Sequence, residues 1–178
     1  MIKFPKVLYH HFEHRILSGT AFGYGNFIFC ISLTNLNSTM EKFRKIKLFP
    51  QQGIHNSGKL VEEIFEYLNG ERKIFSLIPY CLWGTAFFRR VWCETRAIPY
   101  GNIISYSRLA HRIGKVSAVR AVGKALSANP IPLVIPCHRV IGKDGDLVGF
   151  GAGIQIKQKL LELENIFPPP LELLQNNK

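Results

Sequence analysis

The chain has 178 residues, 47% of them hydrophobic and 20% charged, and its formal net charge is +11. That length allows a real core in one domain or two small ones, and the composition is typical of soluble globular proteins. No apolar run is long enough to span a membrane, and the first residues lack the apolar segment of a secretory signal. The positive charge favours an anionic partner, nucleic acid first and an acidic membrane second.

Cysteines stand at positions 30, 81, 93 and 137, without C-x-x-C spacing or paired histidines nearby. This argues against a zinc finger, and an even count does not by itself make a disulfide framework in a chain of this size. His10, His11 and His14 could hold a metal only if His10 and His14 shared a helix face, and their segment is expected to be extended. We therefore expect free thiols, a reducing cytoplasm and no metal.

The first 82 residues predict an α/β scaffold domain, a small antiparallel sheet with a helix. Residues 27–34 form an aromatic and β-branched run typical of a strand. Residues 19–26 predict a turn-rich approach to it, and residues 7–12 are placed to pair with it. Residues 42–47 are compatible with a strand or a short helix.

The clearest helix of this first domain is predicted at residues 57–70. Ser57 is a suitable N-cap and Gly70 a suitable C-terminal cap. The apolar stripe between them consists of Leu60, Ile64, Tyr67 and Leu68. Residues 75–82, which contain Pro79, lead irregularly out of the domain, so we expect the boundary at residue 82.

A second domain, residues 83–167, is predicted to be mostly α-helical. Thr85 caps its first helix, and Pro99 stops it. The inward face of that helix carries Phe88, Val91, Trp92 and Thr95. After the domain, the prolines at 168–170 end the structured sequence, and residues 168–178 are expected to form a flexible tail.

Two short helices are predicted between residues 103 and 128. Ser105 or Ser107 caps the first, Gly114 breaks the chain, and Ser117 caps the second. Two short helices around a glycine predict a helix-turn-helix, whose second helix lies along DNA, although many such pairs never touch DNA.

The second of these helices is rich in small residues around Arg120, which would let it approach a groove closely. An enzyme that acts on a base in a duplex takes that base out of the stack, and a projecting arginine can fill the vacancy. Basic residues strongly outnumber acidic residues between positions 84 and 153. The acidic residues are only Glu94, Asp144 and Asp146, and the basic residues are Arg89, Arg90, Arg96, Arg108, Arg112, Lys115, Arg120, Lys124, Arg139 and Lys143. A scattered, solvated surface charge is the alternative interpretation.

Residues 129–140 form an apolar run, interrupted by three prolines, that ends in Cys137-His138-Arg139. Prolines push their neighbours into extended conformations, so we expect a stiff, buried, extended segment that delivers Cys137 to a fixed position. A neighbouring imidazole or cation lowers the pKa of a thiol and makes it nucleophilic, and His138 and Arg139 are both at hand. A buried structural cysteine is the alternative.

The sequence continues with a turn at residues 140–145 and a glycine-rich stretch at 149–153, whose bare backbone can approach a ligand closely. Residues 154–164 predict a helix with Ile156, Leu160 and Leu163 inward. The run Pro-Cys-His-Arg-Val, with Asn129-Pro130 before it and this helix ending in Leu-Glu-Leu-Glu after it, resembles the O6-alkylguanine-DNA alkyltransferases. These are DNA-repair proteins that move an alkyl group from guanine onto their own cysteine.

The resemblance extends from about residue 84 to 164 and assigns roles to individual residues. Cys137 is the nucleophile and alkyl acceptor, His138 the base acting through a water, and Glu164 the group that orients His138. Asn129 braces the active-site turn, and Tyr106 donates a proton to guanine and helps to rotate the nucleotide. DNA contacts are implied for Arg120 as the finger and for Ser107, Lys115, Ser117, Ala121, Lys124 and Lys143. The base pocket is implied to be lined by Val140, Phe150, Gly151 and Gly153.

The implied reaction gives a thioether, so the protein acts once and needs no cofactor or metal. The resemblance also implies a monomer that acts on double-stranded DNA. O6-alkylguanine is the implied substrate, with O4-alkylthymine and the preferred alkyl size left open. Family members commonly carry a tyrosine where Phe150 stands, so any contribution of its hydroxyl is lost. We hypothesise that Gly151 leaves a roomier pocket for bulky alkyl groups.

Three alternatives compete with this hypothesis. A relative that binds alkylated DNA without repairing it would lack the acceptor cysteine, which is present at position 137. A helix-turn-helix regulator would explain the charge but not the Pro-Cys-His-Arg run. A cysteine hydrolase using Cys137, His138 and Glu164 would explain the thiol but not the basic helix pair.

Overall fold

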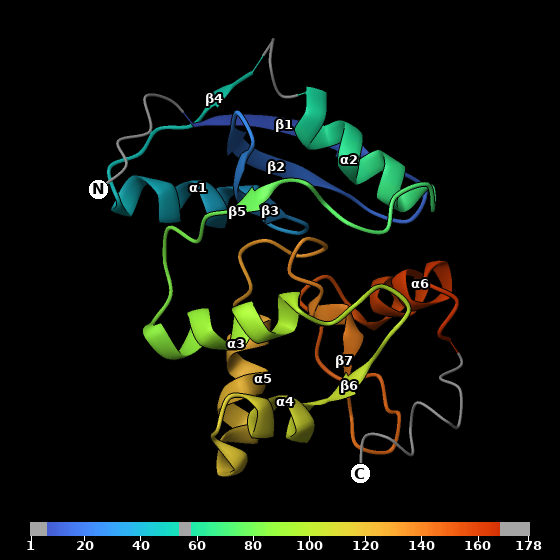
Figure 1. Ribbon diagram of the computed structural model, residues 1–178. Coiled ribbons are helices and arrows are strands. Elements are labelled where there is room, and N and C mark those ends of the chain that lie inside the picture. The colour runs from blue at the N-terminus through green and yellow to red at the C-terminus, as the bar shows by residue number, and fades with distance from the viewer. Residues whose placement is uncertain (1–6, 54–57, 168–178) are drawn as a thin grey trace. The chain divides into compact units, whose positions relative to one another are not determined.

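A computed structural model describes residues 7–53 and 58–167. The chain divides into two compact units, Met1–Leu82 and Trp83–Lys178, and each has a sheet of its own (Figure 1). The expected tail at residues 168–178 lies outside the described residues, as does Ser57 with its expected capping role. Within the described ranges, no helix is both long enough and apolar enough to cross a bilayer.

The first unit is built on a five-stranded sheet of order β4-β1-β2-β3-β5. Its centre is an antiparallel meander of β1 (Leu8–Glu13), β2 (Ser18–Tyr24) and β3 (Phe27–Ser32). The short edge strands β4 (Gln51–Gln52) and β5 (Ile78–Pro79) pair in parallel with β1 and β3. The expected antiparallel sheet is therefore correct for the centre and wrong for the two edges, which makes the sheet mixed.

The central strand β2 occupies the stretch that was expected to be a turn. Its Gly19 has a packing role, because a Cβ there would lie 2.7 Å from the carbonyl oxygen of Ser32 and 2.9 Å from the ring of Phe12. The actual turn is the short link around Gly25, where φ is +56°. β1 consequently pairs with β2 and not with β3, because the extra strand lies between them.

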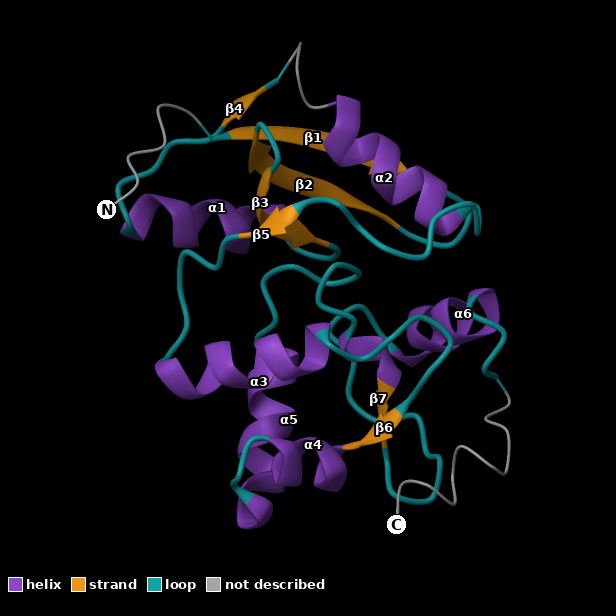
Figure 2. Cartoon of the chain, in the orientation of Figure 1, coloured by secondary structure: helices purple, strands orange, loops and turns teal. Residues whose placement is uncertain are grey.

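Two helices accompany this sheet, α1 (Leu36–Lys45) and α2 (Gly58–Leu68) (Figure 2). The side chain of Asn35 caps α1 by accepting from the backbone N–H of Ser38 at 2.9 Å. The basic stretch at 42–47 is thus mainly the end of a helix. After α2 the chain reverses through Gly70 with φ of +81°, which confirms the expected C-terminal glycine cap.

The second unit is mostly helical, as expected, with α3 (Ala86–Arg96), α4 (Tyr106–Arg112), α5 (Val119–Ser127) and α6 (Ile154–Leu163). Its only β-structure among the described residues is the parallel pair of β6 (Ile104–Ser105) and β7 (Val140–Ile141). The expected caps Thr85 and Ser105 are confirmed, since each side chain accepts a backbone N–H at 3.2 Å.

The link between α4 and α5 differs from the expected single turn. A 3-10 turn, η1 (Val116–Ala118), precedes α5, so Ser117 lies inside this turn and does not cap the helix. Gly114, with φ of +69°, allows the chain to leave α4 sharply. The prediction of Ser117 as the N-cap was wrong because the extra turn shifts the start of α5.

The core of the second unit is formed by α3, α4 and α5 together with the segment after α5. Val91 of α3, Leu109 of α4 and Val122 of α5 are fully buried in one apolar cluster. Trp92 is also in the core, where its indole Nε1 donates to the carbonyl oxygen of Ala125 at 2.7 Å. Burial of a Trp side chain with its polar atom satisfied fixes α3 against α5.

Candidate active site

The segment that precedes Cys137 is a closed turn and not the extended stretch that its prolines predict. The backbone N–H of Ile135 donates to the carbonyl oxygen of Ile131 at 2.9 Å, and Leu133 has a left-handed φ of +73°. A 3-10 turn, η2 (Cys137–Arg139), follows directly. Proline fixes only φ, so it is as compatible with turns as with extended chain. In a 3-10 turn, successive side chains point about 120° apart, so neighbours face different surroundings.

The side chain of Asn129 holds this turn together. Its Oδ1 accepts from the backbone N–H of Ile131 at 3.0 Å, and its Nδ2 donates to the carbonyl oxygen of Ile135 at 2.8 Å. The same Nδ2 lies 3.1 Å from Sγ of Cys137. Asn129 is therefore placed to brace the turn, and it also donates a hydrogen bond to the sulfur, which the sequence did not predict.

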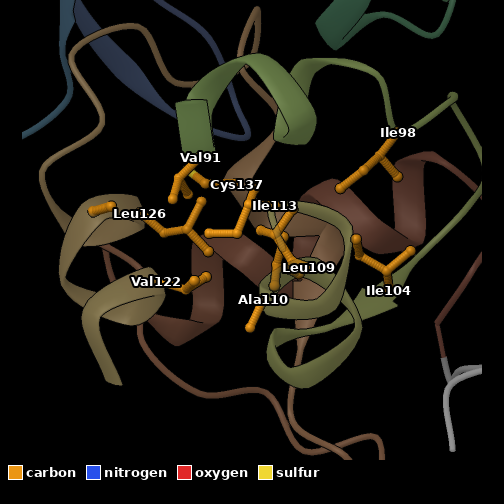
Figure 3. Packing of buried hydrophobic residues seen from close by; sticks show 11 residues of the cluster. Val91, Ile98, Ile104, Leu109, Ala110, Ile113, Val122, Leu126 and Cys137 are labelled. Atoms are coloured by element: carbon orange, nitrogen blue, oxygen red, sulfur yellow. The ribbon is translucent and has the colours of Figure 1, made fainter. Parts of the chain in front are cut away.

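Cys137 lies in the apolar cluster of the second unit and is only 6% exposed (Figure 3). Burial raises the pKa of its thiol, while the hydrogen bond from Asn129 and the positive charge of Lys157 act to lower it. Burial dominates, so the closed structure holds a protonated thiol. Because the thiolate is the nucleophilic form, this cysteine needs a route for its proton.

His138 is fully buried on the other side of the turn, with its Nε2 3.0 Å from Oε1 of Glu164. Burial lowers the pKa of His138, and the carboxylate of Glu164 only partly opposes this effect. The imidazole is therefore neutral. With Nε2–H donating to the carboxylate, Nδ1 is the ring atom that can accept a proton.

Glu164, the residue after α6, is the centre of a buried charged network. The guanidinium of Arg139 reaches both of its oxygens, with Nε at 3.0 and 3.1 Å and Nη2 at 2.8 Å, and the backbone N–H of Gly101 donates to Oε2 at 3.0 Å. Burial would raise the pKa of Glu164, but His138 and Arg139 outweigh it and lower the pKa to about 2. The carboxylate stays ionised at any physiological pH.

The guanidinium of Arg139 is therefore paired with Glu164 and not with the Cys137 thiol, whose activation was expected of it. Its remaining Nη1 donates to the carbonyl oxygen of Ile98 at 2.6 Å, and its guanidinium lies 5.7 Å from the ring centroid of Tyr100. The expectation failed because a 3-10 turn directs this side chain toward the end of α6.

Tyr106, the first residue of α4, is half-buried. Its hydroxyl donates to the carbonyl oxygen of Val148 at 2.9 Å and lies 3.3 Å from that of Gly149. Burial, and secondarily the nearby Cys137, raises the pKa of Tyr106 to about 12. A tyrosine with this pKa keeps its proton until a strong acceptor develops beside it.

Two of the four residues expected to line a base pocket, Val140 and Phe150, lie next to the reactive turn η2. Val140 is fully buried, and the ring of Phe150 stands edge-on to that of His138 with centroids 6.5 Å apart. Gly153 has a φ of +98°, which favours glycine. A Cβ added at Gly151 would come no closer than 4.0 Å to the nearest atom, the carbonyl oxygen of Ser127. Gly151 is thus not required by packing.

The residues expected to contact DNA are all solvent-exposed. α5 buries Val122, Ala125 and Leu126, and it turns Arg120 to solvent on the opposite face. The other expected contacts are exposed as well: Ser107, Lys115, Ser117, Ala121, Lys124 and Lys143. No acidic residue lies on α5. The helix therefore offers a positive surface to an anionic partner.

Sequence reasoning missed Lys157 of α6. Its side chain is fully buried, although lysine is almost never buried in proteins. A signal was present, since positions 157, 160 and 161 follow helical spacing and form the buried face of α6, which Glu164 continues just after the helix. The expected inward residues Ile156 and Leu163 are only half-buried, because the buried face is centred one position later.

Of the histidines at positions 10, 11 and 14, the last two bond to side chains of the first unit. His11 bonds to the hydroxyl of Thr20 at 2.8 Å, and His14 bonds to the side chain of Asn69 at 3.1 Å. Across residues 7–53 and 58–167, no group of three His, Cys, Asp or Glu residues is placed to hold a metal ion.

The site combines a buried thiol, a neutral imidazole held by an ionised carboxylate, and a tyrosine that can donate a proton. This set defines a protein with a nucleophilic thiol. Residues 86–166 match the model of the family described as 6-O-methylguanine DNA methyltransferase, DNA binding domain. The chain belongs to this methylated-DNA–protein-cysteine methyltransferase family, as its similarity to whole relatives also shows.

Among curated proteins, the Haemophilus influenzae methylated-DNA–protein-cysteine methyltransferase is 45% identical over 130 residues, covering 70% of this chain and 73% of the relative. The inducible enzyme of that name from Bacillus subtilis is 50% identical over 102 residues, covering 57% of this chain and 56% of the relative. Among solved structures, that of Mycobacterium tuberculosis OGT in complex with DNA aligns with a TM-score of 0.77 and 34% identity, over 96% of this chain and 99% of that chain.

Proposed function

We propose that this protein repairs DNA by moving the alkyl group of O6-alkylguanine onto its own Cys137. It is a methylated-DNA–protein-cysteine methyltransferase that acts once per molecule. The observation that carries this proposal is a turn that holds the buried Cys137, bonded by Asn129, next to His138, whose imidazole is bound to the buried carboxylate of Glu164 from the end of α6. The DNA complex of the M. tuberculosis relative supports double-stranded DNA as the partner.

The reaction is a substitution at the alkyl carbon. The proton of the Cys137 thiol passes through a water to His138, whose imidazolium is stabilised by the ionised Glu164. The thiolate attacks the alkyl carbon, a C–S bond forms, and the bond from that carbon to O6 breaks with its electron pair on guanine. Tyr106 donates a proton to the guanine and recovers the one that His138 accepted, so overall the thiol proton ends on the restored guanine, which stays in the DNA.

The guanine must leave the helix to reach a buried sulfur. We propose that α4 and α5 act as a helix-turn-helix unit on DNA, with Arg120 filling the place of the extruded base. The exposed face of α5, with Arg120 and Lys124 and without an acid, supports this role. Binding to phosphates should be weak in sequence preference and should fall with increasing salt.

In this proposal residues 83–167 bind DNA and accept the alkyl group, while residues 1–82 serve as scaffold. The protein works as a monomer without a cofactor. We place it with DNA in the cytoplasm, because a reducing compartment keeps Cys137 a free thiol. O4-alkylthymine is a second candidate substrate of the same site.

The test is an intact-mass measurement after incubation with a duplex that carries one O6-methylguanine, with Cys137→Ala alongside. We expect one added methyl per molecule, mapped to Cys137 and absent from the variant. Binding to that duplex in preference to undamaged DNA without any mass change would indicate a lesion-binding protein instead. Turnover of an ester or peptide would indicate a cysteine hydrolase.

A further inference from the structure

Lys157 carries a buried ammonium whose hydrogen-bond acceptors are two neutral carbonyl groups. Its Nζ donates to the carbonyl oxygen of Val140 at 2.6 Å and to that of Val148 at 2.9 Å. Removing an ammonium from water costs several kcal/mol even after relaxation. An apolar side chain would fill this position on α6 without that cost, so the charge needs a reason.

The position of the two carbonyl groups suggests the reason. Val140 directly follows the reactive turn η2, and Val148 opens the glycine-rich loop expected to form a wall of the base pocket. Tyr106 joins the same contact, since its hydroxyl also donates to Val148 and its ring centroid lies 5.9 Å from Nζ. The ammonium therefore connects the cysteine segment, the pocket loop and the proton-donating tyrosine.

The other positive groups near the thiol are not available to it. Arg139 is paired with Glu164, and burial holds the imidazole of His138 neutral. Lys157 and Cys137 interact electrostatically: burial lowers the pKa of Lys157 to about 8, and the negative charge of a Cys137 thiolate raises it. The same interaction lowers the pKa of the thiol.

We infer that Lys157 is a positioning residue for alkyl transfer: its ammonium ties the reactive turn to the pocket loop and provides the positive charge that stabilises the Cys137 thiolate. This inference rests on the proposed function, because a structural cysteine would need no such charge. The thiol is protonated in the resting protein, so the ammonium acts on the thiolate only while the reaction takes place.

The ionisable groups that surround this ammonium come from three elements. Cys137 and His138 belong to η2 and Tyr106 begins α4, while the Glu164–Arg139 pair at the end of α6 is bound to His138. Tyr106 and Glu164 do not change charge near neutral pH, because the pKa is about 12 for the first and about 2 for the second. Burial lowers the pKa of His138, so its imidazole also stays neutral, and a change in the pH profile of the thiol on removing Lys157 is therefore attributable to the lysine.

The first test titrates Cys137 through the ultraviolet absorbance of its thiolate, after subtraction of Cys137→Ser. Lys157 and Cys137 titrate as a coupled pair, so in Lys157→Met we expect the thiolate fraction to fall about tenfold below about pH 8, where the wild-type ammonium is charged, equivalent to a rise of about one unit in the apparent pKa of Cys137. Lys157→Arg keeps the charge and should restore part of the shift. Lys159→Met removes an exposed lysine of the same helix and should titrate like the wild type.

The second test needs no substitution of the lysine, so it remains valid if Lys157→Met does not fold. In protein with isotope-labelled lysine, the Nζ resonance of Lys157 is titrated in the wild type and in Cys137→Ser. The pKa of Lys157 should be lower in the variant, which has no thiolate. An unchanged Lys157 pKa, or an unchanged Cys137 pKa in Lys157→Met, would overturn the inference. Failure of the proposed function is distinct, since it appears as no methyl transfer by the wild type.

Discussion

Replacement of Glu164 by Gln tests whether the charged network behind the active site is also a main support of the second unit. The change keeps the size of the side chain and removes its negative charge. The guanidinium of Arg139, only 6% exposed, then lacks its counter-charge, and His138 loses the carboxylate that orients it. We expect loss of stability and of activity together.

The size of the effect follows from the pKa of Glu164. Its fall from an ordinary 4.5 to about 2 in the folded protein corresponds to about 3 kcal/mol of stability at neutral pH. Breaking a buried ion pair by removing one partner costs about 3–5 kcal/mol in other proteins. Because the folded pKa is lowered, this contribution is present above the unfolded pKa and is lost as the pH falls from about 4.5 toward 2.

Urea unfolding followed by tryptophan fluorescence measures this contribution directly. Both tryptophans, Trp83 and Trp92, belong to the second unit, so the signal reports its unfolding. We expect Glu164→Gln to lower the free energy of unfolding by about 3 kcal/mol at neutral pH, with a much smaller difference from the wild type near pH 2. The loss of stability on acidification should accordingly be weaker in the variant.

The double variant Arg139→Met with Glu164→Gln is the matched control. Removing both charges leaves no uncompensated ion, so the double variant should be more stable than the sum of the single changes implies. A cost below about 1 kcal/mol for Glu164→Gln, with acid sensitivity equal to that of the wild type, would refute the assignment of this pair as a stabilising network.

Three further predictions concern the reaction itself. Asn129→Ala removes the amide from the turn and from the sulfur, so single-turnover methyl transfer should slow by about tenfold or more and the melting temperature should fall. The reason is that each buried polar group left unsatisfied costs about 1–3 kcal/mol. Unchanged rates would contradict the bracing role. Arg120→Ala should slow alkyl transfer from duplex DNA by about tenfold or more but leave the reaction with free O6-benzylguanine unchanged. The reason is that base extrusion, which costs about a few kcal/mol, is needed only in the duplex. Equal losses of rate on both substrates would place Arg120 in the reactive site and not in base extrusion. If the missing side chain at Gly151 leaves room for large alkyl groups, methyl- and benzyl-guanine should react at comparable rates, and strong exclusion of benzyl would disprove this.

The burial of Cys137 also has a consequence for selectivity. A thiol with a raised pKa, 6% exposed, is protected from chance alkylation in solution. In the proposed mechanism the base enters beside Tyr106, whose hydroxyl is bound to the carbonyl group of Val148 in this structure. If Tyr106 is the proton donor, it exchanges that acceptor for guanine, which links proton donation to the presence of the base.

Local sequence features were sufficient for much of the second unit. Thr85 and Ser105 carry the side-chain oxygens that cap helices, and the helical spacing of apolar residues placed α3, α4 and α6 within a few positions. The reactive Cys137 was also evident, because the run around it is specific to one family. These signals depend on neighbours in the chain.

Errors arose where a residue's role depended on distant parts of the chain. Gly19 suggested a turn, but the close approach of Ser32 and Phe12 requires a glycine in the strand β2. The two-residue edge strands carry too little pattern to show that they pair in parallel. The prolines before Cys137 restrict φ in ways that suit both extended chain and turns, and only the hydrogen bonds of Asn129 select the turn.

The sequence by itself therefore determined the family, the helical character of the second unit and the reactive cysteine, because these depend on local capping, periodicity and a contiguous motif. The tertiary structure alone decided the electrostatics of the site. It paired Arg139 with Glu164, left His138 neutral and buried Lys157 where its charge acts on the thiol. Burial and charge pairing are set by which distant segments meet, since desolvation and Coulomb energies depend on distance in space and not on separation along the chain.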